Sequence, residues 1–105
     1  MSLTTYAYYA YSRRVEFEWD EAKRARNRRL HGIDFEEAAT AFFDPLAAIH
    51  VDEVHSRDEH RFRLLSLSRE GRLLVTIFTD RGRRYRIISS RPATKREARD
   101  YEKGI

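Results

Sequence analysis

Cysteine is absent from the 105 residues of this chain, which excludes disulfide bonds and thiolate zinc sites. The sequence also lacks any apolar run near the roughly 20 residues that a membrane-spanning helix needs. It has no basic stretch followed by an apolar stretch of the kind that forms a secretory signal. We therefore expect a cytoplasmic protein with no membrane partner, long enough for one domain with a modest core.

Lysine is scarce too, and it occurs only at Lys23, Lys95 and Lys103. Arginine therefore supplies most of the positive charge in a balance of 21 Lys+Arg against 17 Asp+Glu, a net charge of +4. The arginine side chain keeps its charge at any working pH, and its planar fork of donors matches phosphate geometry. This excess favours a polyanion or an acidic protein as partner and says nothing about the fold.

The most informative segment contains five arginines and no acidic residue between Arg81 and Arg91. It has the pattern of a basic strand that ends at Pro92, followed by a helix with a capping box formed by Thr94 and Glu97. Arginines at the end of a strand, before the free N–H groups of a helix N-terminus, form a candidate phosphate site. Arg91 is the best single candidate for a phosphate ligand.

Two other features of this segment depend on the alternation of side chains along a strand. Arg84 and Arg86 share one face, and Tyr85 and Ile87 share the other, where we expect them in the core. Simple alternation places Arg91 on the face of Tyr85, although Pro92 makes alternation a poor guide there.

The pattern of elements predicts an α+β fold in the order β-α-α-β-β-β-β-α. The economical architecture is an antiparallel β-meander with the helices packed on one face. Residues 1–14 are expected to be a poorly ordered, tyrosine-rich leader, with an arm that stacks on bases as the alternative, and residues 15–105 are expected to form a single domain. The predicted strands are 15–19, 46–51, 61–67, 72–79 and 84–90; the predicted helices are 20–30, with Asp20 as its cap, about 35–42, with a capping box from Asp34 to Glu37, and a last helix from Thr94.

A second basic block lies in the first predicted helix. Five positive charges occur in seven residues, with no acid between them: Lys23, Arg24, Arg26, Arg28 and Arg29. This run is either a solvated helix face or, together with the basic strand, an electrostatic footprint for nucleic acid. His31 follows at the end of the helix, where it either caps the last carbonyl groups or moves a proton.

The segment from His50 to His60 is rich in histidine and acidic residues, but its spacing matches no known pattern of metal ligands. We therefore expect no metal and no other cofactor; a metal nuclease would have to use residues such as His55 and Asp58. Where this segment enters the next predicted strand, Glu59 and Arg61 fall on one face. They form either a surface ion pair or a carboxylate base held next to an arginine.

The order and spacing of many short motifs between Phe17 and Tyr101 resemble the BrnT toxin family. Two departures from the usual motifs are Ser89-Ser90-Arg91 in place of Ser-Ala-Arg, and Leu30-His31-Gly32 in place of Lys-His-Gly. The motifs that carry the resemblance are Phe17-Glu18-Trp19-Asp20, Lys23, Asn27, His31-Gly32-Ile33, Phe35-Glu36-Glu37-Ala38, Phe43-Asp44-Pro45, Glu59-x-Arg61, Gly71-Arg72, Arg86-Ile87-Ile88-Ser89-Ser90-Arg91-Pro92-Ala93, Glu97 and Tyr101.

The resemblance implies a ribonuclease toxin of a type II toxin–antitoxin pair, with a RelE-like fold. It also implies a BrnA-like antitoxin with a ribbon-helix-helix domain, which neutralises the toxin and forms with it a complex that represses their operon. Operator DNA would be bound only through that complex.

RNA cleavage without a metal uses the 2′-hydroxyl group as the nucleophile, so a protein must accept its proton and stabilise a phosphorane-like state. We expect Arg61 and Arg91 to bind the phosphate, and either His31 or Glu59 to act as the base. A non-catalytic basic module that binds nucleic acid or an acidic protein is the alternative. The expected RNA contacts are Lys23, Arg24, Arg86 and Lys95.

Overall fold

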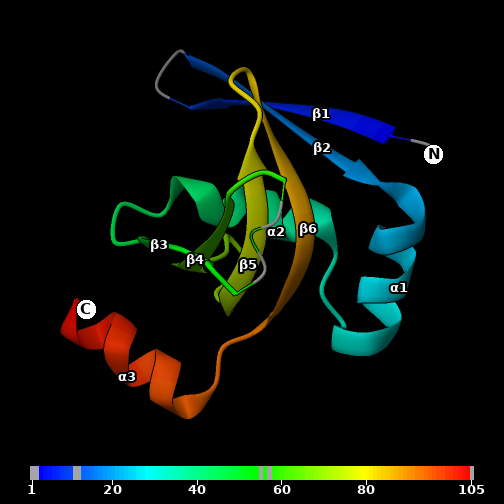
Figure 1. The fold of residues 1–105 in the computed structure, drawn as a ribbon. Coiled ribbons are helices and arrows are strands. Elements are labelled where there is room, and N and C mark those ends of the chain that lie inside the picture. The colour runs from blue at the N-terminus through cyan, green and yellow to red at the C-terminus, as the bar shows by residue number, and fades with distance from the viewer. Residues whose placement is uncertain (1–2, 11–12, 55, 57, 105) are drawn as a thin grey trace.

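The computed structural model describes residues 3–10, 13–54, 56 and 58–104, and these form one mixed β-sheet with helices around it (Figure 1). The strands lie in the order β1-β2-β6-β5-β4-β3. The elements are β1 (Leu3–Ala10), β2 (Arg13–Asp20), α1 (Glu21–His31), α2 (Phe35–Thr40), a 3-10 turn η1 (Ala41–Phe43), β3 (Ala48–Val51), β4 (Arg61–Leu67), β5 (Leu73–Asp80), β6 (Arg84–Pro92) and α3 (Lys95–Lys103).

The predicted α+β class is confirmed, and the predicted meander is present in β3, β4, β5 and β6, which pair antiparallel in sequence order. The sheet as a whole is not antiparallel, because β2 pairs with β6 in parallel. The segment expected to be a leader includes Leu3–Ala10, which form β1 and pair antiparallel with β2 over the full length of β1. Parallel neighbours need a long connection, and here the segment from α1 to β5 separates β2 from β6.

The helix caps follow the sequence signals with one exception. The Asp20 side chain accepts hydrogen bonds at the start of α1, and Gly32 ends that helix in the left-handed conformation with φ of 69°. Thr94 and Glu97 form the predicted capping box of α3. The capping box predicted for α2 is wrong: Asp34 caps the helix, but the Glu37 carboxylate binds Ser68 and Arg72 instead of turning back to the cap.

The core lies on the face of the sheet that α2 covers, behind the sheet in Figure 1. Aromatic rings fill it from two sides: Phe17 of β2 contacts Phe42 with ring centroids 4.9 Å apart, and Phe42 lies 4.9 Å from Phe78 of β5. Tyr85 packs against the same cluster, as expected. The fully buried apolar residues at its centre are Phe17, Trp19, Ile33, Phe35, Ala38, Ala39 and Leu74.

The opposite face of the sheet, which we call the open face, carries arginines instead of a second apolar layer. A β-bulge between β5 and β6 determines which arginines reach it. Ile77 pairs with Ser89, but Phe78 pairs with Ile87, so Ile88 is the extra residue. The bulge reverses the alternation, so that Ser90 turns toward the core and Arg91, the partner of Val75, faces the open side.

Helix α3 does not share the face that α2 covers, which corrects the prediction that all helices pack on one face. Its residues Thr94 and Glu97 line a hollow with Arg63 and Val75 of the open face. The far end of α3 is attached through Tyr101, whose hydroxyl donates a 2.6 Å hydrogen bond to Asp44 Oδ2. The helix therefore borders the open face at the lower left of Figure 1.

Candidate active site

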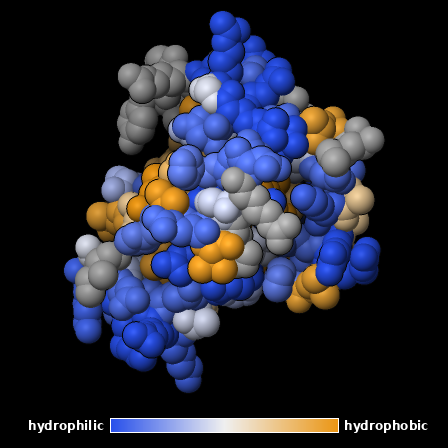
Figure 2. All heavy atoms as spheres, in the orientation of Figure 1, coloured by the Kyte–Doolittle hydropathy of each residue, from blue (hydrophilic) through white to orange (hydrophobic). Residues whose placement is uncertain are grey.

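A cavity of about 530 Å³ lies on the open face, over β4, β5 and β6 and next to the end of α1. The view in Figure 2 shows a surface on which hydrophilic residues cover most of the area and apolar residues form separate patches. Three of the four residues expected to be catalytic meet in this cavity. Its lining is His31, Asp52, Val54, Arg61, Arg63, Val75, Ile77, Ile88, Ser89 and Arg91.

Arg61 and Arg63 enter the cavity from β4. They lie two residues apart in a strand, and their cross-strand partners Thr79 and Ile77 belong to the same face. In the part of the chain that the structure describes, no carboxylate forms an ion pair with either guanidinium. Their charges are thus available to a phosphate. Sequence reasoning missed Arg63, although its spacing from Arg61 was a signal for it.

Arg91 enters the cavity from the end of β6, and its guanidinium group binds the carboxylate of Glu97 in α3. The guanidinium donates two hydrogen bonds to the carboxylate, Nη1 to Oε1 at 2.8 Å and Nη2 to Oε2 at 3.0 Å. The arginine holds the pKa of Glu97 down at about 2, and the carboxylate raises the pKa of Arg91. Arg91 is therefore fixed in place and partly neutralised, whereas Arg61 and Arg63 are not.

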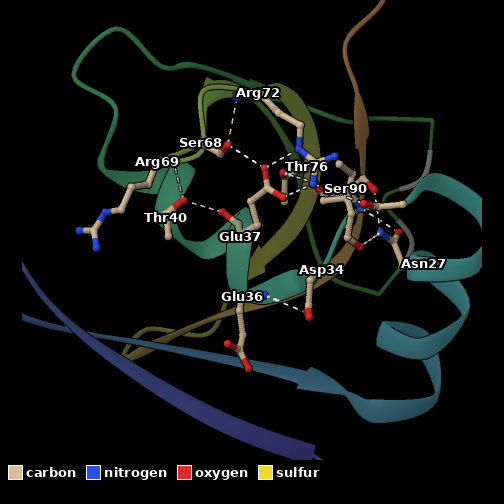
Figure 3. Close-up of polar contacts among 12 residues, drawn as sticks. Asn27, Asp34, Glu36, Glu37, Thr40, Ser68, Arg69, Arg72, Thr76 and Ser90 are labelled. Atoms are coloured by element: carbon tan, nitrogen blue, oxygen red, sulfur yellow. Dashed lines mark hydrogen bonds and ion pairs between the residues drawn. The ribbon is translucent and has the colours of Figure 1, made fainter.

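His31 is exposed at the last turn of α1. The backbone near it is held by the buried side chain of Asn27, which Figure 3 shows beside Ser90. The buried Asn27 amide donates to the carbonyl groups of Ile33, at 2.9 Å, and of Ser90, at 2.7 Å. Its oxygen accepts from the Ser90 backbone N–H at 3.0 Å. Asn27 thereby joins α1 to β6 at the position where His31 and Ser89 line the same cavity.

A second support for this turn comes from the β4–β5 connection. Arg72 donates a 3.3 Å hydrogen bond to the carbonyl oxygen of Gly32, the residue after His31. Its guanidinium also binds the buried Glu37 carboxylate, with Nε 2.8 Å from Oε2, and Ser68 donates to the same oxygen at 2.8 Å. Arg72 lowers the pKa of Glu37 through these hydrogen bonds. Figure 3 shows Glu37, Ser68 and Arg72 turned toward one another.

Glu59, the other candidate base, lies outside the lining of the cavity. Its carboxylate accepts a 2.9 Å hydrogen bond from Arg81, in the β5–β6 turn, and Glu59 precedes the first residue of β4. The ion pair that the sequence suggested therefore exists with Arg81 as the partner, and Arg61 is not involved. Among the described residues, Asp52 is the acidic side chain in the lining, and sequence reasoning did not single it out.

The expected RNA contacts fall in different places. Lys23 lines a smaller hollow next to the cavity, and Lys95 is exposed at the start of α3. Arg86 lies on the open face but is drawn toward Glu18 of β2, with 3.5 Å between Nη2 and Oε2, and its buried Nε has no partner among the described residues. Arg24 already forms ion pairs within the protein: its side chain contacts Glu21, Asp34 and Glu36 within 3.4 Å.

The described residues around the cavity form no recognisable metal centre. Among the residues that the structure describes, no group of three or more histidine or acidic side chains is placed to hold a metal ion. Of the two residues that a metal nuclease would need, His55 lies outside the described residues. The residues that line the cavity can bind an anion through their guanidinium groups and exchange a proton through the imidazole of His31.

Comparison with known proteins connects this geometry to one family. Residues 19–97 match a family model described as the ribonuclease toxin BrnT of type II toxin–antitoxin systems. The crystal structure of the Brucella abortus ribonuclease toxin BrnT has the same fold, with a TM-score of 0.56 and 24% sequence identity over 73% of this chain and 94% of that chain. No curated protein matches the chain. No helix among the described residues is long and apolar enough to cross a membrane.

Proposed function

Because the chain belongs to the BrnT family of ribonuclease toxins of type II toxin–antitoxin systems, we propose that it cleaves RNA in the cavity of the open face. The observation that carries this proposal is the meeting of Arg61, Arg91 and His31 in one cavity from three separate elements. Arg63 adds a third guanidinium to the same lining. A site with several guanidinium groups beside one imidazole suits phosphoryl transfer from RNA.

The proposed reaction begins when His31 accepts the proton of the 2′-hydroxyl group. The 2′-oxygen attacks the adjacent phosphorus, and the bond from phosphorus to the 5′-oxygen breaks, which leaves a 2′,3′-cyclic phosphate and a free 5′-hydroxyl group. Water donates the proton that the leaving 5′-oxygen takes up. Arg61 and Arg63 bind the phosphate oxygens as negative charge develops, with Arg91 held beside them by Glu97.

The proposed cleavage needs no metal, because guanidinium groups supply the positive charge at the phosphate. We test this proposal by incubating the purified protein with a long single-stranded RNA in EDTA, and by inducing the toxin in cells that lack an antitoxin. Arg61→Ala should lower the cleavage rate by roughly 10²–10³-fold, the usual effect of removing a transition-state donor. Arg61→Ala should also relieve growth arrest in proportion to its loss of cleavage rate.

Arg69→Ala is the matched control for this experiment. Arg69 is exposed in the β4–β5 turn, and its side chain points away from the neighbouring contacts in Figure 3. This variant should cleave RNA like the wild type. An Arg61→Ala protein that cleaves at the wild-type rate would contradict the assignment. Cleavage that EDTA abolishes and a divalent cation restores would replace it with a metal-dependent mechanism.

The partner that we propose is a BrnA-like antitoxin with a ribbon-helix-helix domain, which binds this chain and blocks cleavage. Operator DNA would then be bound by the complex and not by the toxin alone. The family consists of toxins of type II toxin–antitoxin systems, and this membership supports a protein antitoxin as the partner. Where a neighbouring reading frame encodes a ribbon-helix-helix protein, co-expression of the two proteins should yield a stable complex, and a mobility-shift assay should detect DNA binding only by that complex.

A non-catalytic binding module is the second candidate, since the open face and α1 carry exposed cations. Such a module would bind RNA or an acidic protein in a salt-dependent manner without producing cleavage fragments. Binding without a 2′,3′-cyclic phosphate product, under conditions in which the wild type arrests growth, would favour this candidate over the ribonuclease.

A further inference from the structure

A smaller hollow of about 230 Å³ adjoins the cavity of the open face, between α1 and β6. His31, Ile88 and Ser89 line both spaces, so the hollow and the cavity meet along a common wall. On its other side the hollow is bounded by α1, through Lys23, Arg26 and Leu30. A ligand that extends from the cavity past His31 would enter this hollow.

The α1 side of the hollow is one face of the helix. Lys23, Arg26, Asn27 and Leu30 are spaced i, i+3, i+4 and i+7, which places them on a common face. Asn27 anchors this face to β6 through its bonds to Ser90. The cations of the basic helix therefore have separate positions: Lys23 and Arg26 border the hollow, while Arg24 points to the acidic cluster around Asp34.

The two cations at the hollow are available to a ligand. In the described ranges no carboxylate forms an ion pair with Lys23 or Arg26, and both side chains are exposed. The remaining lining is suited to a flat apolar group, because Leu30 and Ile88 contribute aliphatic carbon. Asn27 offers little to a ligand, since its amide already binds Ile33 and Ser90.

We propose that this hollow is a nucleotide subsite, which binds the base of the ribonucleotide that carries the attacking 2′-hydroxyl group, while Arg26 binds the phosphate on its 5′ side. The inference rests on the proposed function, and in particular on His31 as the base. A base is attached one carbon away from the 2′-hydroxyl group, so a nucleotide whose hydroxyl reaches His31 places its base close to that side chain. The hollow that shares His31 with the cavity is the space at that position.

The test uses a DNA strand with one ribonucleotide, placed at the position that the wild type cuts in the all-RNA strand of the same sequence. Cleavage then needs the 2′-hydroxyl of that nucleotide alone. A neutral methylphosphonate in place of the phosphate on its 5′ side should lower kcat/KM of the wild type about tenfold, the size of one charge-assisted hydrogen bond. An abasic ribonucleotide at the same position should lower kcat/KM by a similar factor.

Arg26→Ala should show the lower kcat/KM with the ordinary strand and should be insensitive to the methylphosphonate. Arg29→Ala is the matched control, because Arg29 is an exposed arginine of the same helix that does not line the hollow. This control should keep the tenfold sensitivity of the wild type. The loss of sensitivity in Arg26→Ala alone separates a local contact from a general effect of net charge.

The results distinguish the subsite from the proposed function. If the wild type cleaves the strands but tolerates both the methylphosphonate and the abasic nucleotide, the subsite is wrong and the ribonuclease assignment stands. If Arg26→Ala keeps the methylphosphonate sensitivity, the phosphate contact is wrong. If the wild type cleaves neither the chimeric strand nor the all-RNA strand, the proposed function fails, and the subsite fails with it.

Discussion

Arg91 of β6 and Glu97 of α3 are joined by two hydrogen bonds, of 2.8 and 3.0 Å, which attach a wall of the cavity to the start of α3. The same Glu97 carboxylate accepts a 2.8 Å hydrogen bond from the backbone N–H of Thr94 in the capping box. One side chain therefore serves both the helix cap and the candidate active site. The orientation of Arg91 depends on α3 being folded against the sheet.

This pair makes stability depend on pH in the acid range. The hydrogen bonds with Arg91 lower the pKa of Glu97 from 4.5 to about 2. A carboxyl group with a lowered pKa stabilises the fold fully above its unfolded pKa, and this stabilisation is lost as the pH falls from about 4.5 toward 2. Glu97→Gln should remove about 1–2 kcal/mol at pH 7, since the 39% exposure of the Arg91 side chain weakens the pair.

Urea unfolding at a series of pH values measures this effect. The difference in free energy of unfolding between the wild type and Glu97→Gln should shrink steadily below pH 4.5. Glu102→Gln, which replaces an exposed carboxylate of the same helix, is the matched control and should be as stable as the wild type at pH 7. A constant difference between wild type and Glu97→Gln from pH 7 to pH 2 would show that the pair does not hold the charged form.

The base of the proposed reaction can be identified by paired substitutions. His31 lines the cavity, whereas Glu59 binds Arg81 outside it. His31→Ala should therefore lower kcat roughly 10²–10⁴-fold, the range for a general base, with little change in KM. Glu59→Gln should cleave RNA within about twofold of the wild type, because its ion pair is exposed and weak. A large loss of kcat in Glu59→Gln with an active His31→Ala would reverse the assignment.

Sequence patterns predicted the local features of the fold correctly where one segment determines them. The cap at Asp20, the glycine end of α1 at Gly32 and the capping box of α3 each depend on a few neighbouring residues. The antiparallel pairing of β4, β5 and β6 follows from the short turns between these strands. The parallel pairing of β2 with β6 was not predicted, because it joins segments far apart in the sequence and no turn signals it.

The candidate site was predicted in part, for a similar physical reason. Alternation along β6 failed for Arg91 because the bulge at Ile88 reverses the faces, and a bulge depends on the partner strand. The partners of Arg24 could not be predicted from the local pattern either, because Asp34 and Glu36 belong to the cap and first turn of the next helix. Whether an arginine is available for a ligand depends on which carboxylates the fold places near it.

Arg24 supplies a direct test of this point. Its guanidinium binds Asp34, with Nε 2.8 Å from Oδ1, and it lies 5.9 Å from the centre of the Trp19 ring. Arg24→Ala should lower the free energy of unfolding by about 1–2 kcal/mol, because it leaves a half-buried carboxylate at the cap of α2 without its partner. RNA cleavage by the folded protein should stay within about twofold of the wild type.

Chemical denaturation and NMR titration would check the Arg24 prediction. Hydrogen bonding by Arg24 is the largest cause of the lowered pKa of Asp34, so this pKa should rise toward its ordinary value in the variant. Arg29→Ala, on the same helix, should change neither stability nor the pKa of Asp34. Full stability of Arg24→Ala combined with strongly weakened RNA binding would return Arg24 to the RNA contacts that the sequence suggested.

Arg72 and Glu37 form an ion pair next to the turn that follows His31, and the last prediction concerns this pair. The Glu37 side chain is 8% exposed, and the Arg72 side chain that forms the ion pair with it is 48% exposed. Arg72→Ala should leave the carboxylate buried with Ser68 as its remaining side-chain donor among the described residues. We expect a loss of about 2–3 kcal/mol in the free energy of unfolding, below the value for a fully buried pair because Arg72 is half exposed.

A double-mutant cycle separates the pair from the packing around it. Glu37→Met in the Arg72→Ala background removes the unpaired charge at similar volume, so the double variant should be more stable than Arg72→Ala alone. Stability of Arg72→Ala should also fall less at low pH, where Glu37 is protonated and needs no partner. Arg69→Ala, in the same turn, should resemble the wild type. If Glu37→Met gives no recovery, the loss comes from the missing Arg72 bond to Gly32 and not from the buried charge.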